Sequence, residues 1–272
     1  MRTIVHLSDL HFGRVDHALL APLQELTARL APDVVVVSGD LTQRAKTEEF
    51  KAARAFLDTL PGPQIVVPGN HDIPLYNVAT RFLTPLRKYT RYVTLDLAPE
   101  YIDDEIAILG INTARSLTFK DGRINDEQVA QMRQRMSAVN PNLTRIIVTH
   151  HPFDLPDTFD KDDLVDRAPM AMRAFSECGV DLLLAGHLHA SHAGNSEKRY
   201  KLSGYAALVV QAGTATSTRG RGESNSFNVI RVDGERIEVD RYSWIDGTGS
   251  FERVMTECFQ RIGEAWHMAA QA

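Results

Sequence analysis

The sequence contains few cysteines and no long apolar segment. Its 272 residues include two cysteines, Cys178 and Cys258, which do not form a C-x-x-C pair. We therefore expect two reduced thiols rather than a disulfide framework or a thiolate metal site. No apolar run approaches the ~20 residues of a membrane-spanning helix, and the first residues lack the apolar core of a signal peptide. These absences predict a cytoplasmic protein without a transmembrane segment.

The sequence also lacks an excess of basic residues. It has 30 Lys and Arg against 35 Asp and Glu, which gives a formal net charge of −5. Because a protein that coats nucleic acid usually carries a basic face, we expect no stable nucleic-acid binding. Hydrophobic residues make up 43% of the chain, so one large α/β domain can bury a sizeable core.

Short apolar runs alternate with helix-like segments along most of the chain. Strands are expected at residues 3–7, 34–38, 64–68, 106–111, 145–149 and 181–185. Helices are expected at residues 19–30, 48–60, 80–88, 127–136 and 169–178, with Pro85 interrupting the third.

Later strands, expected at 207–211, 226–232 and 237–242, have no helices between them, and Asp233-Gly234 predicts a hairpin turn. The sequence therefore predicts an α/β fold with βαβ units first and antiparallel strands later. We expect the two mixed β-sheets to stack with helices on their outer faces, as a four-layer αββα sandwich.

The end of the chain is expected to differ from the rest. Residues 1–250 are assigned to one domain, and residues 251–272 to a C-terminal amphipathic helix, because apolar residues recur there at helical spacing. Packing of this helix on the domain is favoured over a role in a dimer, and the sequence leaves a homodimer open.

Five short segments place metal-ligand residue types directly after apolar runs. They are Asp9-Leu10-His11, Gly39-Asp40, Gly69-Asn70-His71-Asp72, His150-His151 and Gly186-His187-Leu188-His189. Six of the ten histidines lie in them. Each segment alone has an ordinary structural explanation, such as an Asx turn or a buried polar pair. Five such strand ends in one chain predict an assembled metal site.

The chemistry of these side chains narrows the kind of site. Burying several carboxylates and imidazoles without partners would cost several kcal/mol for each charged group, and a cation removes that cost. The ligands are oxygen and imidazole without thiolate, which suits Mn²⁺, Fe or Zn²⁺ and disfavours a closed structural zinc site. There are too many for one ion, so we expect two ions that share a carboxylate.

The five segments resemble the sequence blocks of the calcineurin-like metallophosphoesterases. The order D-x-H, G-D, G-N-H-D, H-H and G-H-x-H runs from Asp9 to His189, about two-thirds of the chain. The motifs V-x-H-H-P and G-H-L-H are most similar to those of the bacterial branch that holds class III cyclic nucleotide phosphodiesterases and glycerophosphodiesterases. The family fold, a double β-sheet sandwich flanked by helices, agrees with the strand pattern.

The resemblance implies two divalent metal ions per chain and a ligand set for each ion. The first ion would be held by Asp9, His11, Asp40 and His189. The second would be held by Asp40, Asn70, His150 and His187, so that Asp40 bridges the two. The catalytic residue would be His71, facing the substrate, while Asp72 and His151 would orient the ligands.

The implied mechanism follows from charge. Two bound cations would supply positive charge for the phosphoryl oxygens and would acidify a water for attack on phosphorus. Negative charge develops on the leaving oxygen, which His71 as an imidazolium can protonate.

Four arginines on two loops are candidate substrate-binding residues. They are Arg115, Arg123, Arg219 and Arg221, in loops rich in Gly, Ser and Thr. An arginine on such a loop can grip a phosphate oxygen. The alternative, a solvated loop with exposed arginines, stays open.

The sequence thus predicts a phosphodiesterase that hydrolyses small phosphodiesters, with cyclic nucleotides or glycerophosphodiesters as the natural substrate. Two other enzymes stay open, a pyrophosphatase acting on a nucleoside-diphosphate sugar lipid and a nuclease. A metal-binding scaffold without catalysis is the alternative from another class. His71 speaks against it, because a scaffold needs metal ligands but no proton donor.

Overall fold

The computed structural model describes residues 1–75, 78–116, 121–156, 159, 163–219 and 223–269. In these residues the strands form two mixed sheets, one of eight strands and one of six. The first sheet has the order β3 (Gln64–Val66), β2 (Val34–Val37), β1 (Arg2–Leu7), β11 (Ser226–Asp233), β12 (Arg236–Ile245), β13 (Ser250–Ile262), β14 (Glu264–Met268) and β9 (Tyr205–Ala206). The second has the order β4 (Glu100–Ile102), β5 (Ile106–Gly110), β6 (Thr144–Val148), β7 (Leu182–Ala185), β10 (Leu208–Gln211) and β8 (His192–Asn195).

Each sheet combines a parallel part with antiparallel strands. In the first sheet β1, β2 and β3 are parallel, while β11 joins β1 in antiparallel register and begins the β11–β14 meander. In the second, β5, β6, β7 and β10 are parallel, and β4 and β8 are antiparallel edge strands. The predicted change from βαβ units to antiparallel strands is thus present.

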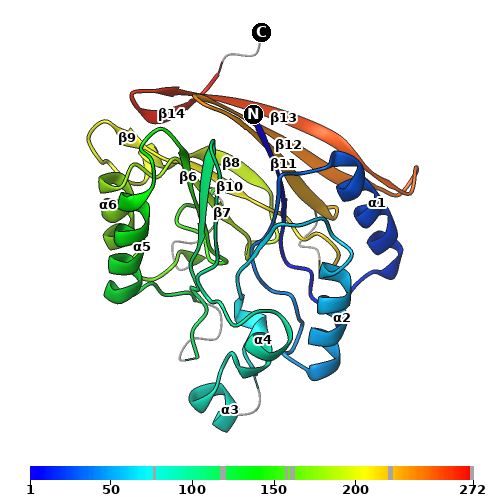
Figure 1. Ribbon diagram of the computed structural model, residues 1–272. Helices are drawn as coiled ribbons and strands as arrows, with labels where there is room; N and C mark the ends of the chain where they lie inside the picture. The colour runs from blue at the N-terminus through cyan, green and yellow to red at the C-terminus, as the bar shows by residue number, and fades with distance from the viewer. Residues whose placement is uncertain (76–77, 117–120, 157–158, 160–162, 220–222, 270–272) are drawn as a thin grey trace.

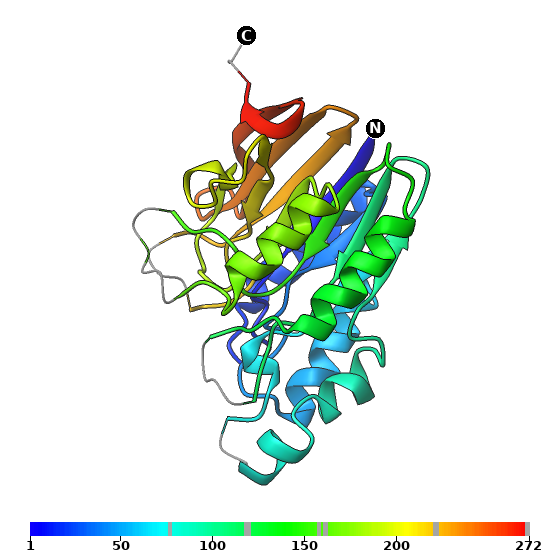
Figure 2. The same ribbon diagram turned by 90° about the vertical axis from the view of Figure 1, so that its left-hand side faces the viewer.

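Helices cover the outer face of each sheet. Helices α1 (Leu20–Leu30), α2 (Thr47–Leu57) and α4 (Arg87–Tyr92) lie on the first sheet, and α5 (Asp126–Ala138) and α6 (Ala168–Glu177) on the second (Figures 1 and 2). A third apolar cluster, which includes Ile4, Val36, Ile108 and Leu184, fills the space between the sheets. The predicted four-layer sandwich is therefore confirmed.

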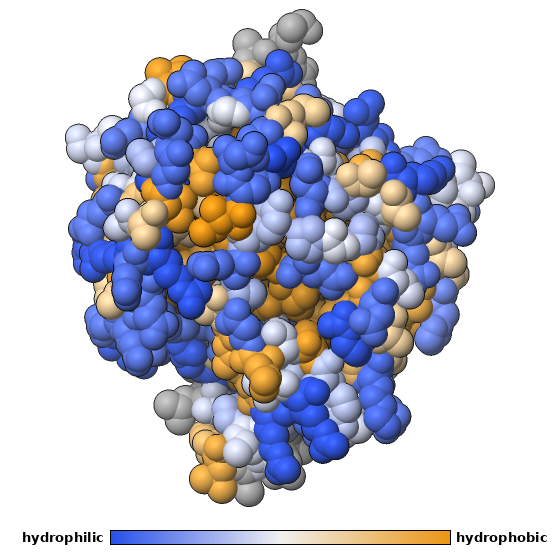
Figure 3. Space-filling model, viewed as in Figure 1, coloured by the Kyte–Doolittle hydropathy of each residue, from blue (hydrophilic) through white to orange (hydrophobic). Residues whose placement is uncertain are grey.

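The surface matches this layering. Figure 3 shows hydrophilic side chains over both helix layers and hydrophobic side chains along the middle of the face between them. None of the described helices is long and apolar enough to cross a membrane.

The prediction of a C-terminal helix was wrong. Residues 250–262 form β13, which pairs antiparallel with β12, and after Gly263 the chain returns as β14. Phe251 packs in the cluster under α1 and Phe259 in the cluster between the sheets. The apolar spacing of this segment also fits a helix, but pairing with β12 satisfies its backbone and decides its structure. The last described segment is therefore part of the first sheet.

The helix expected at residues 80–88 is broken in two. Helix α3 (Val78–Leu83) ends before Pro85 and α4 begins at Arg87. Proline lacks a backbone N–H and its ring clashes with the preceding turn, so it separates the two short helices.

Candidate metal centre

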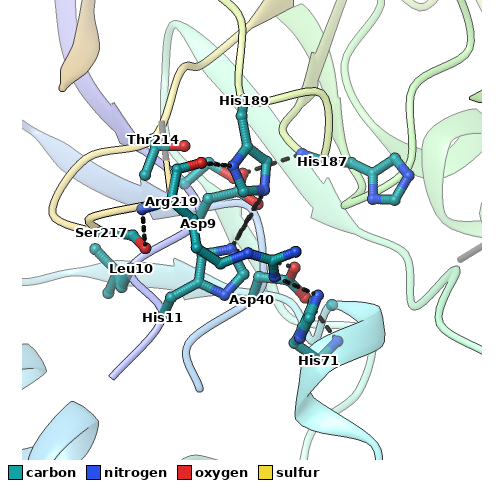
Figure 4. A network of polar contacts seen from close by, with 12 residues as sticks. Asp9, Leu10, His11, Asp40, His71, His187, His189, Thr214, Ser217 and Arg219 are labelled. Carbon is teal, nitrogen blue, oxygen red and sulfur yellow. Dashed lines mark hydrogen bonds and ion pairs between the residues drawn. The ribbon is translucent and has the colours of Figure 1, made fainter. Parts of the chain in front are cut away.

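The five ligand segments follow parallel strands and meet at one edge of the sandwich. Asp9 and His11 follow β1, Asp40 follows β2, and the 3-10 helix η2 (Asn70–Asp72) comes after β3. From the other sheet, His150 and His151 follow β6, and His187 and His189 follow β7. The segments are joined across the sandwich, since the backbone N–H of His187 donates to Asp9 Oδ2 at 3.0 Å. Figure 4 shows part of this convergence.

The ligand segments have an unusual backbone. Eight described residues other than glycine have a positive φ, and five of them are ligand candidates: Asp9, His11, Asp40, His187 and His189. Their φ values lie between 49° and 73°, in the left-handed region that side chains with a Cβ rarely adopt. Such strain persists only where the surrounding structure holds it, and it is typical of functional sites.

Glycines allow the ligand segments to approach one another. A Cβ on Gly69 would lie 2.1 Å from Asp40 Oδ1 and 2.4 Å from its backbone nitrogen. A Cβ on Gly186 would lie 1.8 Å from Ser8 Oγ and 2.7 Å from Asp9 Oδ2. These glycines are needed for close approach rather than for an unusual φ.

Gly69→Ala is expected to weaken metal binding strongly, because the added methyl group collides with the backbone and carboxylate of Asp40. Gly247→Ala is the matched control, since no atom lies within 4 Å of the Cβ it would gain. Calorimetric titration with Mn²⁺ should give much lower affinity for the Gly69 variant and wild-type affinity for the Gly247 variant. Equal affinities would show that Gly69 does not set the position of Asp40.

The first cluster contains Asp9, His11, Asp40 and His189, the residues implied for the first ion. The Nε2 atoms of His11 and His189 lie 3.5 Å and 3.3 Å from Asp9 Oδ1. They lie 3.3 Å from each other, and His11 Nε2 lies 3.7 Å from Asp40 Oδ2. All four side chains are buried. The predicted ligand set for the first ion is thus brought together.

The second cluster forms around the other oxygen of Asp40. His150 Nε2 lies 3.4 Å from Asp40 Oδ1 and 3.0 Å from Asn70 Oδ1. The other ring nitrogen of His150, Nδ1, is paired with the carbonyl of Ser38 at 2.8 Å, which directs Nε2 into the cluster. Three of the four residues implied for the second ion therefore converge.

The fourth, His187, takes a different position. Its ring lies beside those of His150 and His151, with centroids 5.1 Å and 4.7 Å away. In the described residues its nitrogen groups with those two histidines and not with Asp40. Figure 4 shows its ring pointing away from His189. His187 thus borders the second cluster from the side of His150.

Asp40 and His150 form a buried ion pair. Burial opposes the charge on Asp40, but His150 outweighs it and holds the pKa of this carboxyl well below its usual range. Burial likewise lowers the pKa of His150, but Asp40 raises it to about 9. Burial, together with the charge on His150, lowers the pKa of His187 to about 3.

This pair predicts a pH dependence for the metal-free protein. Because the pKa of His150 rises from 6.5 to about 9 on folding, its contribution to stability is fully present below 6.5 and is lost as the pH rises through 9. In chelator-treated protein, we expect wild type to have a higher free energy of unfolding than His150→Gln. The gap between the two should be largest at about pH 6. Denaturant titrations should show the gap narrowing by on the order of 3 kcal/mol by about pH 10. A gap that does not change with pH would contradict the assignment.

The donor set fits divalent cations. Among the described residues, the buried Oδ1 of Asp9 has no hydrogen-bond partner, although two imidazole nitrogens face it. Burying a carboxylate oxygen and two imidazole nitrogens that face one point without sharing a proton costs free energy. A cation among them removes that cost. Oxygen and imidazole ligands without thiolate suit Mn²⁺, Fe or Zn²⁺.

Asp72 supports the clusters without facing them. Its carboxylate accepts hydrogen bonds from the backbone N–H groups of Gly69, Leu41 and Thr42 at 2.9–3.2 Å, and from the Thr42 hydroxyl. It thereby ties the loop after β2 to η2. Burial, followed by the nearby charge of Asp40, raises the pKa of Asp72 to about 6.

His151 is also held from behind. Its Nδ1 is 2.8 Å from Thr113 Oγ1, and a Cβ on Gly122 would lie 2.2 Å from its ring. The sequence did not connect Thr113 or Gly122 with His151, because Thr113 lies 38 residues before it and neither residue carries a ligand pattern of its own.

His71 faces the first cluster with one edge of its ring and contacts Arg219 with the other. Its ring packs edge-on against His11 at a centroid distance of 4.9 Å. Its Nδ1 is 2.8 Å from the carbonyl of Gln43, and its Nε2 is 2.9 Å from Nη1 of Arg219. Burial, followed by the charges of His11 and Arg219, lowers the pKa of His71. In this arrangement Nδ1 donates to the carbonyl of Gln43 and Nε2 accepts from Arg219, so Nε2 has to gain a proton before it can protonate a leaving group.

The four candidate arginines have different positions. Arg219 lies at the site, as Figure 4 shows, and Arg221 lies outside the described residues. Arg115 donates to Gln128 Oε1 and to the carbonyl of Asn112, so it braces the start of α5. Arg123 lies 3.5 Å from Asp166 and is half-buried. In the described part of the chain, neither Arg115 nor Arg123 is brought to the ligand clusters.

Fold and clusters together define an α/β protein that gathers metal ligands at its strand ends. Residues 2–191, more than half of the chain, match the family model described as calcineurin-like phosphoesterase. The chain therefore belongs to the calcineurin-like phosphoesterase family, as its five sequence blocks indicated.

Three known proteins illustrate the relationship. A glycerophosphodiester phosphodiesterase of Enterobacter lignolyticus is 27% identical over 206 residues, which cover 65% of this chain and 69% of that protein. A cAMP/cGMP dual specificity phosphodiesterase of Mycobacterium tuberculosis is 27% identical over 255 residues, covering 84% and 75%. The crystal structure of a dimetal phosphatase from Danio rerio superposes with a TM-score of 0.68 at 13% identity, covering 94% of this chain and 98% of that one, and shows the shared fold.

Proposed function

We propose that this phosphoesterase is a phosphodiesterase that holds two divalent metal ions and hydrolyses small phosphodiesters. The observation that carries the proposal is the position of Asp40. One of its carboxylate oxygens faces His11 in the first cluster and the other faces His150 in the second. A carboxylate between two ligand clusters can bridge two ions. When bound, such ions supply positive charge for the phosphoryl oxygens and acidify a water for attack on phosphorus.

The residues of the chain orient the reactants. Asp9, His11 and His189 would hold one side of the substrate-binding centre, and Asn70 and His150 the other. His71 lies beside His11, and because its Nδ1 is paired with the carbonyl of Gln43, Nε2 is the ring nitrogen that could reach a substrate once Arg219 no longer occupies it. Once protonated at Nε2, His71 would donate that proton to the leaving oxygen of the substrate.

Charge and relatives both support a diester. A diester carries one negative charge, whereas a monoester dianion would gain from several further cationic contacts. In the described residues, Arg219 is the candidate arginine that lies at the clusters. The two relatives named above are both named as phosphodiesterases, one for glycerophosphodiesters and one for cyclic nucleotides.

The expected result is a higher kcat/KM for bis-p-nitrophenyl phosphate than for p-nitrophenyl phosphate with the Mn²⁺-loaded protein. The same assay should include cyclic AMP, glycerophosphodiesters and a nucleoside-diphosphate sugar. Faster hydrolysis of the monoester would make the protein a phosphomonoesterase. Hydrolysis of the nucleoside-diphosphate sugar alone would make it a pyrophosphatase, and binding of metal without any hydrolysis would make it a scaffold.

A further inference from the structure

The backbone of Arg219 is fixed by the same elements that carry the first cluster. Within its loop, the N–H of Ala215 donates to the carbonyl of Ser8 at 3.0 Å, and the Thr216 hydroxyl donates to the carbonyl of Leu10 at 2.9 Å. The N–H of Arg219 donates to Ser217 Oγ at 3.1 Å, and its carbonyl is 3.2 Å from His189 Nδ1. Arg219 therefore helps to aim a metal ligand through its main chain, whatever its side chain does.

The guanidinium of Arg219 has more hydrogen-bond donors than its contacts in the described residues use. Its five N–H donors suit the two oxygens of a carboxylate or a phosphate. Within the described part of the chain its side chain forms one hydrogen bond, to the neutral imidazole of His71, and no ion pair with a carboxylate. A half-buried cation on a neutral acceptor, at the rim of an anion-binding centre, is available for an anionic ligand.

The contact with His71 is also incompatible with the proposed role of that histidine. Because the carbonyl of Gln43 takes the proton on Nδ1, Nε2 of His71 is an acceptor and receives the hydrogen bond from Arg219. Nε2 is the ring nitrogen left for the substrate. Contact between His71 and a leaving oxygen therefore requires Arg219 to move away.

We propose that Arg219 is a specificity-determining residue that exchanges partners when the substrate binds. Without substrate, its guanidinium occupies Nε2 of His71. With substrate, it moves to a non-bridging oxygen of the phosphoryl group, and Nε2 of His71, no longer occupied by Arg219, can take up a proton from water and pass it to the leaving oxygen. The arginine thus links recognition of a phosphoryl anion to the availability of His71. This inference rests on the proposed phosphoryl-transfer function and adds a recognition residue to it.

The experiment uses dimethyl phosphate, a diester monoanion that is hydrolysed slowly, with the Zn²⁺-loaded protein. Calorimetry should give a Kd about 10- to 100-fold higher for Arg219→Gln than for wild type, the loss of one charge-assisted hydrogen bond. Arg29→Gln is the control for net charge, since Arg29 is exposed on α1, and its Kd should equal that of wild type. Millimolar guanidinium should restore part of the affinity of Arg219→Ala.

The exchange itself is visible by ¹⁵N NMR of the histidine side chains. In wild type, dimethyl phosphate should shift the Nε2 resonance of His71, because Arg219 leaves it. In Arg219→Gln the resonance should differ from wild type before the ligand is added and respond less to it. Wild-type affinity of Arg219→Gln, or an Nε2 resonance in wild type that the ligand leaves unchanged, would overturn the proposal. The proposed function fails separately, if wild type itself binds fewer than two ions or hydrolyses no diester.

Discussion

Asp40→Ala should lose both metal ions and, with them, hydrolytic activity. Asp40 has one carboxylate oxygen facing each cluster, Oδ2 at 3.7 Å from His11 Nε2 and Oδ1 at 3.4 Å from His150 Nε2. Metal affinity should therefore fall by more than the about 10- to 100-fold that follows loss of a residue behind the ligands. Elemental analysis after dialysis against Mn²⁺, with bis-p-nitrophenyl phosphate hydrolysis on the same samples, measures both effects.

Asp9→Ala is the control variant for the loss of both ions. Asp9 faces the two imidazoles of the first cluster, so its loss should remove one ion and leave the other bound. If Asp40→Ala also keeps one tightly bound ion, Asp40 does not bridge, and the two clusters act independently.

His71→Ala should keep both ions but lower kcat by about 10²- to 10⁴-fold, the usual range for a lost general acid. The loss should be largest for diesters with poor leaving groups and should shrink for p-nitrophenolate, which needs little protonation. The measurement is the dependence of log kcat/KM on leaving-group pKa, for wild type and variant, over a series of aryl diesters.

Asn70→Ala separates this role from metal binding. Asn70 Oδ1 lies 3.0 Å from His150 Nε2 in the second cluster, so its loss should weaken one ion and be partly rescued by added Mn²⁺. If log kcat/KM of His71→Ala depends no more steeply on leaving-group pKa than that of wild type, His71 does not protonate the leaving group. The proton would then come from another source.

The ligand segments could be predicted because their signal is local. Each follows an apolar run, and the carboxyl ends of parallel strands meet at the same edge of a sheet, so short sequence motifs suffice to place Asp9, Asp40 and His150 together. The position of Pro85 likewise marked where a helix breaks.

The C-terminal segment could not be predicted because its structure depends on a distant partner. From Phe251 onward the apolar residues fit helical spacing, yet β13 pairs with β12 over ten residue pairs. A sheet edge that is already formed supplies backbone hydrogen bonds that no local pattern reveals.

Contacts between side chains of distant segments were equally hidden. Arg219 and His71 are 148 residues apart, and the loop of Arg219 reveals only a cation among small residues. His187 lies beside His151, whose own ring contacts Thr113 and Gly122 from a third segment. Such packing is fixed by the assembled fold rather than by sequence spacing.

The most direct test of the account is the number of metal ions that the wild-type chain needs for activity. Chelator-treated protein should be titrated with Mn²⁺ while bound metal, electron paramagnetic resonance and bis-p-nitrophenyl phosphate hydrolysis are followed together. A carboxylate shared between two clusters predicts activity that saturates at two ions per chain, with a spin-coupled signal from neighbouring ions. Full activity at one ion per chain, without spin coupling, would contradict the bridged centre around Asp40.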